Sequence, residues 1–354
     1  MGRKASTTWV GIQEESRKGV RIWIGVDVHK KSYSVAVLSE SGVLHTFVAP
    51  ADDRALVEQI LASGVTVNAL VYEAGLTGFG LYRTCQDAGI FAMVVSANRI
   101  PRPATQSAKT DKIDCIALAR YASMGLLKGI AVPTVQQEAT RSIIRRRQAV
   151  SRELAKAKVM IKSFLTCHSL PEPDGLKTWN AESRRELDTM AMQPGLRFTL
   201  DSLLRQLRQF EEEKKLLEEA VKTTIPPKGD DVLQTVPGVG PITSAAFRAE
   251  LLSPDRFECS EKLTSFLGLA PVVSRSGESR GKSRLVPCGQ GALRSMLVEA
   301  AWVLSAKEKW AKEYYSKIRR RSGLFQKAII ALARKLAVIL WCLWRENRPY
   351  RSEQ

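Results

Sequence analysis

The chain has 354 residues, 44% of them hydrophobic, which is enough for two or three packed domains and excludes a disordered polypeptide. Its 54 Lys and Arg against 36 Asp and Glu give a formal net charge of +18, so we expect a polyanionic partner, first of all nucleic acid. The six scattered cysteines form no C-x-x-C pair, which argues against a zinc site or a disulfide framework. No segment is apolar and long enough to be a signal peptide or to span a bilayer, so we expect a cytoplasmic protein with no membrane partner.

The N-terminal part of the chain alternates between strand and helix patterns. Residues 21–39 have period-two polarity and predict two strands joined by a short turn, and 42–49 predicts a third strand. The next elements are a helix over 51–63, a strand over 65–75, a short helix over 78–89, a strand over 90–96 and a helix within 108–122. This βββαβαβ order followed by a helix predicts an α/β, ribonuclease-H-like domain over 21–135, preceded by an extension over 1–20.

The rest of the chain is predicted to be mainly helical. Residues 136–224 contain long charged helices with Leu and Phe at three- and four-residue spacing, typical of a helical hairpin or coiled coil that brings protomers together. The stretch 225–231 breaks the helix and begins a C-terminal domain over 225–354. We expect the late aromatic residues to pack between helices rather than to stack on bases: Trp302, Trp310, Tyr314 and Tyr315.

Two acids, Asp111 and Asp114, lie three residues apart on one helical face and repel each other unless a cation separates them. They either cap the helix N-terminus or hold a divalent metal ion. Asp27 stands in the middle of the first strand, where an unpaired charge is costly, and Glu73 ends a later strand, where the alternative is a solvated strand end. In a ribonuclease-H-like fold these four places converge, and four carboxylates suit Mg²⁺ (or Mn²⁺), which favours the metal site over the cap.

Basic runs occur at 141–152, 274–284 and 316–323. Each alone is explained by a solvated helix face or loop, but together with the net charge they favour contact with phosphate. The glycines of the turn before residue 241, Gly238 and Gly240, predict free N–H groups at a helix start, as in a helix-hairpin-helix that grips a phosphate. A plain turn between helices is the alternative.

Six blocks follow one another along the chain: IGVDVHKKSYSVAV, VYEAGLTGFGLYR, SAKTDKIDCIALARYA, LQTVPGVGPITSAAFRAEL, FLGLAPVVSRSGESRGKSR and LRSMLVEAAW. Together they resemble the DEDD transposases of bacterial insertion sequences, the insertion sequence 110 family, from about residue 21 to about residue 345. The resemblance implies that Asp27, Glu73, Asp111 and Asp114 are the metal ligands of a domain similar to the Holliday-junction resolvase RuvC. It also implies a nucleophilic serine in the C-terminal domain and guidance by a structured bridge RNA.

The block GLAPVVSRSG matches the family pattern G-L-x-P-x-x-x-S-S-G and marks Ser276 as the nucleophile. Arg275 replaces the first serine of that pattern, and Ser274 is the second candidate. Cations around the serine would hold a phosphodiester and stabilise its developing charge, although a flexible loop that only touches phosphate is the alternative. The expected nucleic-acid contacts besides Gly238 and Gly240 are Lys109, Arg275, Arg280, Lys282 and Arg284.

The expected function is therefore a bacterial, nucleoid-associated transposase that recombines donor and target DNA through a covalent phosphoserine. The resemblance suggests a homo-oligomer, a dimer or tetramer, with sites assembled from two protomers. Two alternatives stay open: a metal-dependent, structure-specific DNA endonuclease that uses water as nucleophile, and a non-catalytic scaffold that binds nucleic acid.

Overall fold

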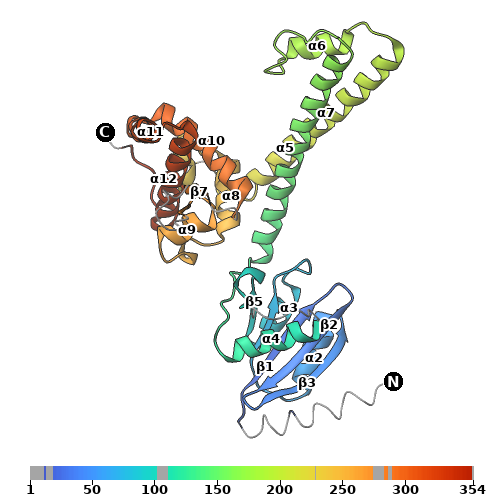
Figure 1. Cartoon of the computed structure of the whole chain (residues 1–354), viewed down its shortest axis with the longest axis vertical. Coiled ribbons are helices and arrows are strands. Elements are labelled where there is room, and N and C mark those ends of the chain that lie inside the picture. Colours follow the sequence, from blue (N-terminus) through green and yellow to red (C-terminus); the bar gives the residue numbers. More distant parts are fainter. Residues whose placement is uncertain are drawn as a thin grey trace, which may run out of the picture. The chain divides into compact units, whose positions relative to one another are not determined.

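The computed structural model describes residues 12, 19–101, 111–227, 229–273, 283–285 and 289–352, without the side chains of 111–113, 272, 273 and 283–285. The chain divides into two compact units, Met1–Val132 and Pro133–Gln354. Figure 1 shows that the first unit contains the large sheet and that the second is mostly helical. No helix among the described residues is long and apolar enough to cross a membrane. The finer division into an extension and three domains stays a prediction.

The first unit is built on a five-stranded mixed sheet. Its elements are β1 (Ile22–Val28), β2 (Ser32–Ser39), β3 (Gly42–Pro50), α2 (Asp53–Ala62), β4 (Val67–Glu73), α3 (Gly80–Asp87), β5 (Ala92–Val95), a 3₁₀ turn (Ala97–Arg99) and α4 (Asp111–Ser123). The strand order is β3-β2-β1-β4-β5; β2 pairs antiparallel with both β3 and β1, and β4 and β5 run parallel to β1. The order of elements predicted from the sequence is confirmed, and the fold is a mixed sheet layered with helices.

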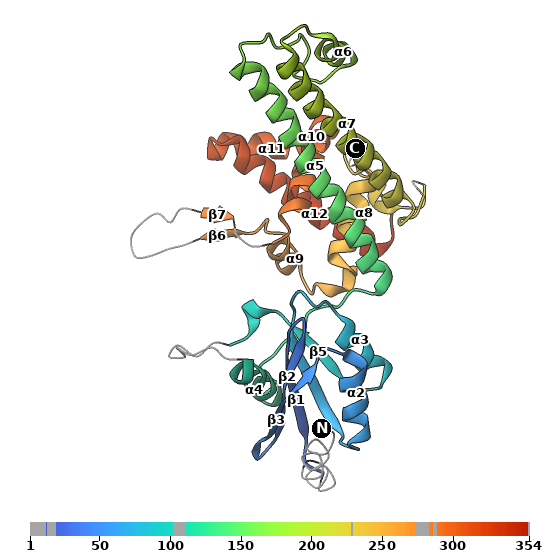
Figure 2. The same cartoon turned by 90° about the vertical axis from the view of Figure 1, so that its right-hand side faces the viewer.

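Helices cover both faces of this sheet. Figure 2 shows α2 and α3 on one side and α4 on the other. Ile24 of β1 belongs to the core on the α2 and α3 side, and Trp23 belongs to the core on the α4 side. Gly25 lies under α4, where an added Cβ would come within 2.0 Å of the Cys115 carbonyl oxygen and 2.7 Å of the Ala119 nitrogen. Glycine is therefore required at this position, because α4 packs directly on the backbone of β1.

The second unit begins with a long helical hairpin. Its helices are α5 (Val135–Cys167), α6 (Ala181–Thr189), α7 (Pro194–Lys222), α8 (Pro241–Leu251), α9 (Ser260–Phe266), α10 (Gly291–Lys307), α11 (Lys309–Ser322) and α12 (Phe325–Glu346), with 3₁₀ turns at Val232–Thr235 and Pro254–Arg256 and a two-stranded ribbon of β6 (Pro271–Val273) and β7 (Ser283–Leu285). α5 and α7 pack side by side with α6 at the far end (Figure 1). Leu154 and Ile161 of α5 share a core with Leu200 and Leu207 of α7. The predicted hairpin thus forms within one chain.

The C-terminal core is centred on α12. Nine residues of this helix are buried, and eight of them share one cluster with residues of α8, α9, α10 and α11. Trp310 of α11 donates from Nε1 to the Tyr350 hydroxyl at 2.8 Å, and Trp302 of α10 lies 5.4 Å from the Tyr315 ring. These late aromatic residues pack between helices, as the sequence predicted.

Candidate active site

Asp27 and Glu73 lie at the carboxyl ends of two neighbouring parallel strands. The register of β1 and β4 pairs Gly25 with Val71 and Val26 with Tyr72, so Asp27 and Glu73 follow directly after the last pair. Alternation along the strands places both on the α4 face, because Val71 belongs to the core on that side. The Asp27 side chain is 20% exposed and Glu73 is exposed. The sheet therefore brings these two predicted site residues to one edge.

Helix α4 brings Asp114 toward the same edge. Its contact with Gly25 sets Cys115 over β1, and Asp114 next to it is partly exposed. Burial, together with the nearby carboxylates of Asp27 and Asp114, raises the pKa of the Cys115 thiol to about 11. The carboxylates of Asp27 and Asp114 therefore both lie near the Cys115 thiol. Asp111, the first residue of α4, lies one turn earlier, and its side chain is outside the description.

The donor chemistry of this edge fits a hard divalent cation, since Asp27, Glu73 and Asp114 all offer carboxylate oxygens. Among the described residues, no three His, Cys, Asp or Glu side chains gather closely enough to hold a metal ion. The Asp111 carboxylate lies outside the described side chains. The four-carboxylate site therefore stays a prediction, with its strand and helix positions established.

His29 lies next to Asp27, in the short turn between β1 and β2, and no role in the site was predicted for it from the sequence. Its Nε2 lies 3.1 Å from Asp27 Oδ2, and its backbone N–H donates to the Ser32 carbonyl at the start of β2. The i, i+2 spacing at the end of a strand, which puts both side chains on one face, was the available signal. This contact helps to fix the orientation of the Asp27 carboxylate.

The predicted nucleophile lies between β6 and β7. These strands pair antiparallel, with Val273 opposite Ser283, so residues 274–282 connect the two strands. Ser274, Arg275, Ser276, Arg280 and Lys282 lie outside the described residues, as does Lys109 in the first unit. Arg284 lies on β7 opposite Val272, and its side chain is not described. The ribbon itself was not anticipated from the sequence.

The predicted glycine turn leads directly into α8. Val239 donates its N–H to the Val236 carbonyl at 3.0 Å, and Gly240 is the residue before the helix. Gly238 has φ +91°, and a Cβ there would lie 2.5 Å from the Ala300 carbonyl oxygen of α10. Both the left-handed conformation and the close approach require glycine. The turn is confirmed, whereas its helix-hairpin-helix character and its phosphate contact stay predictions.

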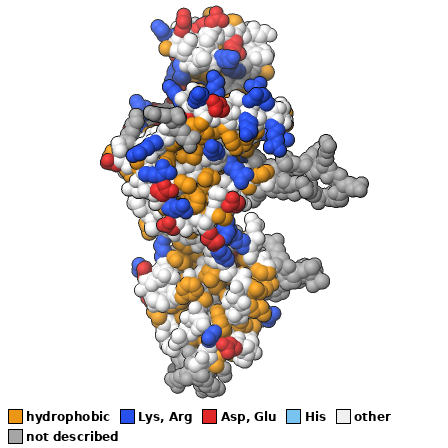
Figure 3. Space-filling view, turned by 90° about the vertical axis from the view of Figure 1, so that its left-hand side faces the viewer, with side chains coloured by type: hydrophobic (Ala, Val, Ile, Leu, Met, Phe, Trp, Pro, Cys, Tyr) orange, Lys and Arg blue, Asp and Glu red, His pale blue; other side chains and the backbone are white. Residues whose placement is uncertain are grey.

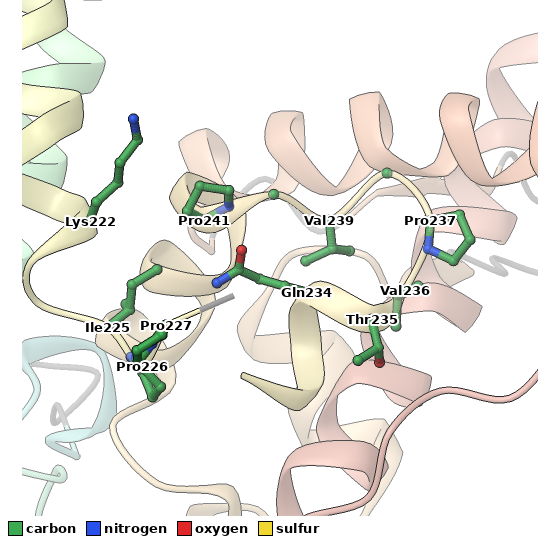
Figure 4. A pocket seen from close by; sticks show the side chains of 12 residues that line it. Lys222, Ile225, Pro226, Pro227, Gln234, Thr235, Val236, Pro237, Val239 and Pro241 are labelled. Atoms are coloured by element: carbon green, nitrogen blue, oxygen red, sulfur yellow. The ribbon is translucent and has the colours of Figure 1, made fainter. Parts of the chain in front are cut away.

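A hollow of about 660 Å³ opens beside this turn. Figure 4 shows that Gln234, Val239 and Pro241 border it, with Ile225 and Lys222 from the end of α7 on the other side. Most of its lining is proline, valine and glycine, so its walls are apolar and one cation stands at its edge. The start of α8 faces this hollow, which leaves space beside the first turn of the helix.

A buried carboxylate fixes the segment before this turn. Asp231 is fully buried and accepts hydrogen bonds from the Ser244 hydroxyl, from Arg248 Nη2 at 2.7 Å and from the Leu233 N–H at 3.1 Å. Burial opposes ionisation, but the hydrogen bonds from Ser244, Arg248 and Gln234 outweigh it and hold the pKa of Asp231 below its ordinary value. This network attaches the 3₁₀ turn Val232–Thr235 to α8.

The basic run at 141–152 is largely ion-paired within the protein. Arg145 Nε donates to Glu250 Oε1 at 3.0 Å, and Arg141 reaches the same carboxylate at 3.2 Å. The next two arginines of α5 pair with α7, Arg146 with Glu213 and Arg147 with Glu218. Three carboxylates thus pair with these four guanidinium groups and neutralise most of their charge within the protein. Figure 3 nevertheless shows Lys and Arg side chains spread widely over one face of the helical unit.

Comparison with known proteins identifies the family. A transposase model of the DEDD type of IS110 matches residues 24–169, and a model described as the transposase IS116/IS110/IS902 family matches residues 230–316. The chain belongs to the IS110 family of transposases. It is accordingly a DNA transposase. The first match includes all four predicted metal ligands of this transposase, and the second includes Ser276, Gly238 and Gly240.

Two relatives match this transposase over nearly its whole length. The putative transposase y4qE of Sinorhizobium fredii (strain NBRC 101917 / NGR234) is 28% identical over 93% of this chain and 90% of its own. The transposase for insertion sequence element IS1111A of Coxiella burnetii is 26% identical over 96% and 93%. A solved structure, T. thermophilus RuvC in complex with Holliday junction substrate, matches 31% of this chain and 99% of its own at 14% identity, with a TM-score of 0.23.

Proposed function

We propose that this transposase cuts and rejoins DNA through Ser276, with Asp27, Glu73, Asp111 and Asp114 holding Mg²⁺ (or Mn²⁺). The observation that carries the proposal is the direct packing of α4 on β1 at Gly25. It supports convergence of the four acids, because α4 can approach the strand that carries Asp27 only where no side chain intervenes. An acidic helix N-terminus set against two strand-end carboxylates suits a divalent cation better than a simple cap.

The chemistry assigned to Ser276 is a reversible phosphoryl transfer. The serine oxygen attacks the phosphorus of the scissile bond and gives up its proton, and the deoxyribose oxygen that leaves takes up a proton. Rejoining is the reverse step, in which a strand-end hydroxyl attacks the phosphoserine and frees the serine. A bound Mg²⁺ would supply charge stabilisation at the phosphate oxygens. Because each bond broken is matched by one formed, no nucleotide cofactor is needed.

The chain offers two kinds of contact for the DNA backbone in this proposal. Charged contacts near the serine stabilise the developing negative charge, and backbone N–H groups at the start of α8 bind a phosphate without reading sequence. The open hollow beside the turn leaves room for that second contact. The proposed nucleic-acid-binding residues are Lys109, Arg275, Arg280, Lys282, Arg284, Gly238 and Gly240.

The test is whether a covalent protein–DNA adduct forms. End-labelled DNA on a denaturing gel should shift to protein size with the wild type and should not shift with Ser276→Ala. Asp27→Asn should also give no adduct, because it removes a proposed metal ligand and leaves the attacking oxygen in place. Ser274→Ala is the matched control, and its adduct should persist. Cleavage by the wild type without any adduct would replace this mechanism by the hydrolytic, water-using endonuclease.

We also propose that the hairpin of α5 and α7 brings protomers together in a dimer or tetramer. Its inner faces are buried within the chain, yet several large apolar side chains remain exposed on the outside, where they cost free energy in water. They are Val159, Met160, Phe198 and Leu216. Light scattering should give at least a dimer, and Val159→Ser with Phe198→Ser should shift the population toward monomer. A monomer in the wild type, both free and with nucleic acid, would contradict this proposal.

A structured bridge RNA is the proposed source of target specificity. The support is the family membership, together with a net charge of +18, an excess of cations that the acids of the chain cannot neutralise. Sequencing RNA that co-purifies with the protein should return one enriched transcript. A background of unrelated cellular RNA without enrichment would instead place recognition on the protein.

A further inference from the structure

The outer face of α11 is a dense row of exposed cations. The helix is short, and its exposed positions are almost all Lys or Arg, with Glu313 as the acid among them. No Asp or Glu in the described part of the chain forms an ion pair with these cations, whereas most arginines of α5 have such partners. They are Lys309, Lys312, Lys317, Arg319, Arg320 and Arg321.

The opposite face of α11 holds the helix firmly in place. Ala311 is fully buried, and Trp310, Tyr314 and Tyr315 pack against the C-terminal core. The Lys335 ammonium of α12 lies 4.4 Å from the centre of the Trp310 ring, a cation–π contact that adds to the packing. The row of cations is therefore displayed on a fixed helix and not on a flexible loop.

The charge on this segment is more than a folded surface requires. Residues 307–327 contain eight Lys and Arg and two Asp and Glu, a net +6, one third of the +18 of the whole chain. One of the two acids, Glu308, bonds to the Ser352 hydroxyl. Like charges at i, i+3 and i, i+4 repel each other, so such a row is stabilised when an anion lies along it. The charge pattern therefore points to a polyanion with closely spaced charges.

We propose that the outer face of α11 binds the phosphate backbone of duplex DNA without reading its sequence. Residues 309–320 extend about 16 Å along the helix axis, and duplex DNA presents a phosphate about every 1.7 Å of its own axis, so several phosphates face the row at once. Single strands and RNA loops are held mainly by aromatic side chains that stack on bases, and the aromatic residues of α11 pack against the protein core. The face is therefore suited to a regular duplex backbone.

This inference rests on the DNA transposase activity and is independent of the metal and serine proposals. The match to the second family model ends at residue 316, so the three arginines Arg319–Arg321 lie beyond that model. A variant that lacks the nucleophile, Ser276→Ala, should bind duplex DNA with the wild-type salt dependence, because it removes no charge. A failure of the α11 proposal can thus be distinguished from a failure of the proposed serine and metal chemistry.

The experiment measures binding to a fluorescent duplex of random sequence over a range of salt concentrations. The test variant carries Lys309→Gln, Lys312→Gln, Arg319→Gln and Arg320→Gln. Each lost phosphate contact lowers the slope of log K against log salt by about 0.9, so a drop of about 3 to 4 is expected. Near 0.1 M salt the affinity should fall by roughly a hundredfold or more.

The control variant removes the same charge from the hairpin. It carries Gln at four exposed cations of the α6 and α7 region that have no ion-pair partner among the described residues: Lys177, Arg185, Arg205 and Lys215. Both variants have a net charge of +14, four less than +18. The control should keep the wild-type slope to within about one unit, and both variants should keep the wild-type circular dichroism.

Three outcomes would overturn the proposal. An equal loss in the control would mean that bulk charge, and not α11, attracts DNA. An unchanged slope in the α11 variant would mean that the face makes no phosphate contact. A loss seen only with a single-stranded RNA probe, with duplex binding intact, would assign the face to RNA.

Discussion

Two arginine-rich runs that look alike in the sequence have different environments in the fold. On α5, the four arginines within 141–147 all meet carboxylates, two at Glu250 and the others at Glu213 and Glu218. On α11, the arginines 319–321 are exposed and form no ion pair with any described acid. Positive charge along a sequence therefore does not by itself identify a nucleic-acid surface. What sets α11 apart is that its unpaired cations form a dense row on one helix that is packed in place.

The ion pairs of α5 join elements that are distant in the sequence. Glu250 of α8 is 4% exposed and binds two guanidinium groups, so it attaches the C-terminal core to the hairpin. Glu213 and Glu218 hold α7 against α5. Because a buried carboxylate without its partners is costly, these pairs have a structural role that an exposed row of cations does not have.

The largest effect on stability is expected from Glu250→Gln. The change leaves Arg141, whose side chain is 18% exposed, facing a neutral amide, so unfolding by urea should require about 2–3 kcal/mol less free energy. Glu153→Gln on α5 is the control, since its partner Lys156 is well exposed and the loss should stay below about 0.5 kcal/mol. Equal stability of the two variants would show that the α5 arginines are not structural, and the comparison with α11 would fail.

Asp231 extends the comparison to an arginine on a third helix, Arg248 of α8. Asp231→Asn should destabilise by about 2 kcal/mol at neutral pH, because it removes a fully buried charge that accepts hydrogen bonds from Ser244 and Arg248. The folded-state pKa of Asp231 is lowered from 3.8, so its contribution is complete above about pH 4 and is lost as the pH falls through the lower folded value. The gap in unfolding free energy between wild type and variant should therefore narrow below pH 4. A gap that stays constant down to pH 3 would contradict the ionised state assigned to Asp231.

Much of the first unit could be predicted from the sequence, because its signals are local. Period-two alternation over 21–39 and helical spacing over 51–63 gave the element order that the structure confirms. The contact of α4 with Gly25 could not be predicted in the same way, since it joins residues 90 apart in the chain. A glycine inside an apolar strand was the local sign of a close approach.

The partners of the α5 arginines were inaccessible to sequence reasoning for the same reason. Glu213 and Glu250 lie 67 and 105 residues beyond the arginines they pair with, so only the fold shows which charges are balanced. Asp27 and Glu73 both lie on strands, as predicted, because a carboxylate inside or at the end of a strand is a local anomaly. Asp27, however, is next to the last residue of β1 and not in its middle. The ribbon of β6 and β7 was missed, since three-residue strands carry too little pattern.

A smaller effect is expected from Arg146→Gln, which tests the exposed end of the α5 run. The side chains of Arg146 and Glu213 are 58% and 34% exposed, so water screens the pair and the loss of stability should be about 0.5 kcal/mol. Binding of duplex DNA should keep its salt slope, because this guanidinium already has a carboxylate partner. A slope that falls by about 0.9, as for one lost phosphate contact, would show that ion-paired arginines also bind DNA.

The smallest effect on stability is expected from Arg319→Gln with Arg320→Gln, the pair that matters most for DNA. Two contributions oppose each other on α11. Removing cations from the last turn loses a favourable interaction with the helix dipole of about 0.3–1 kcal/mol, and it relieves repulsion between Arg320 and Lys317, three residues earlier, of about 0.2–0.5 kcal/mol. The net change in unfolding free energy should therefore stay within about 0.5 kcal/mol, at low salt and at high salt alike. Urea unfolding at both salt concentrations measures it, with Glu250→Gln as the reference for a structural charge. A loss of unfolding free energy above about 1 kcal/mol would mean that Arg319 and Arg320 have a partner within the protein. The arginines of α5 and α11 would then both stabilise the fold, and only the size of their contributions would differ.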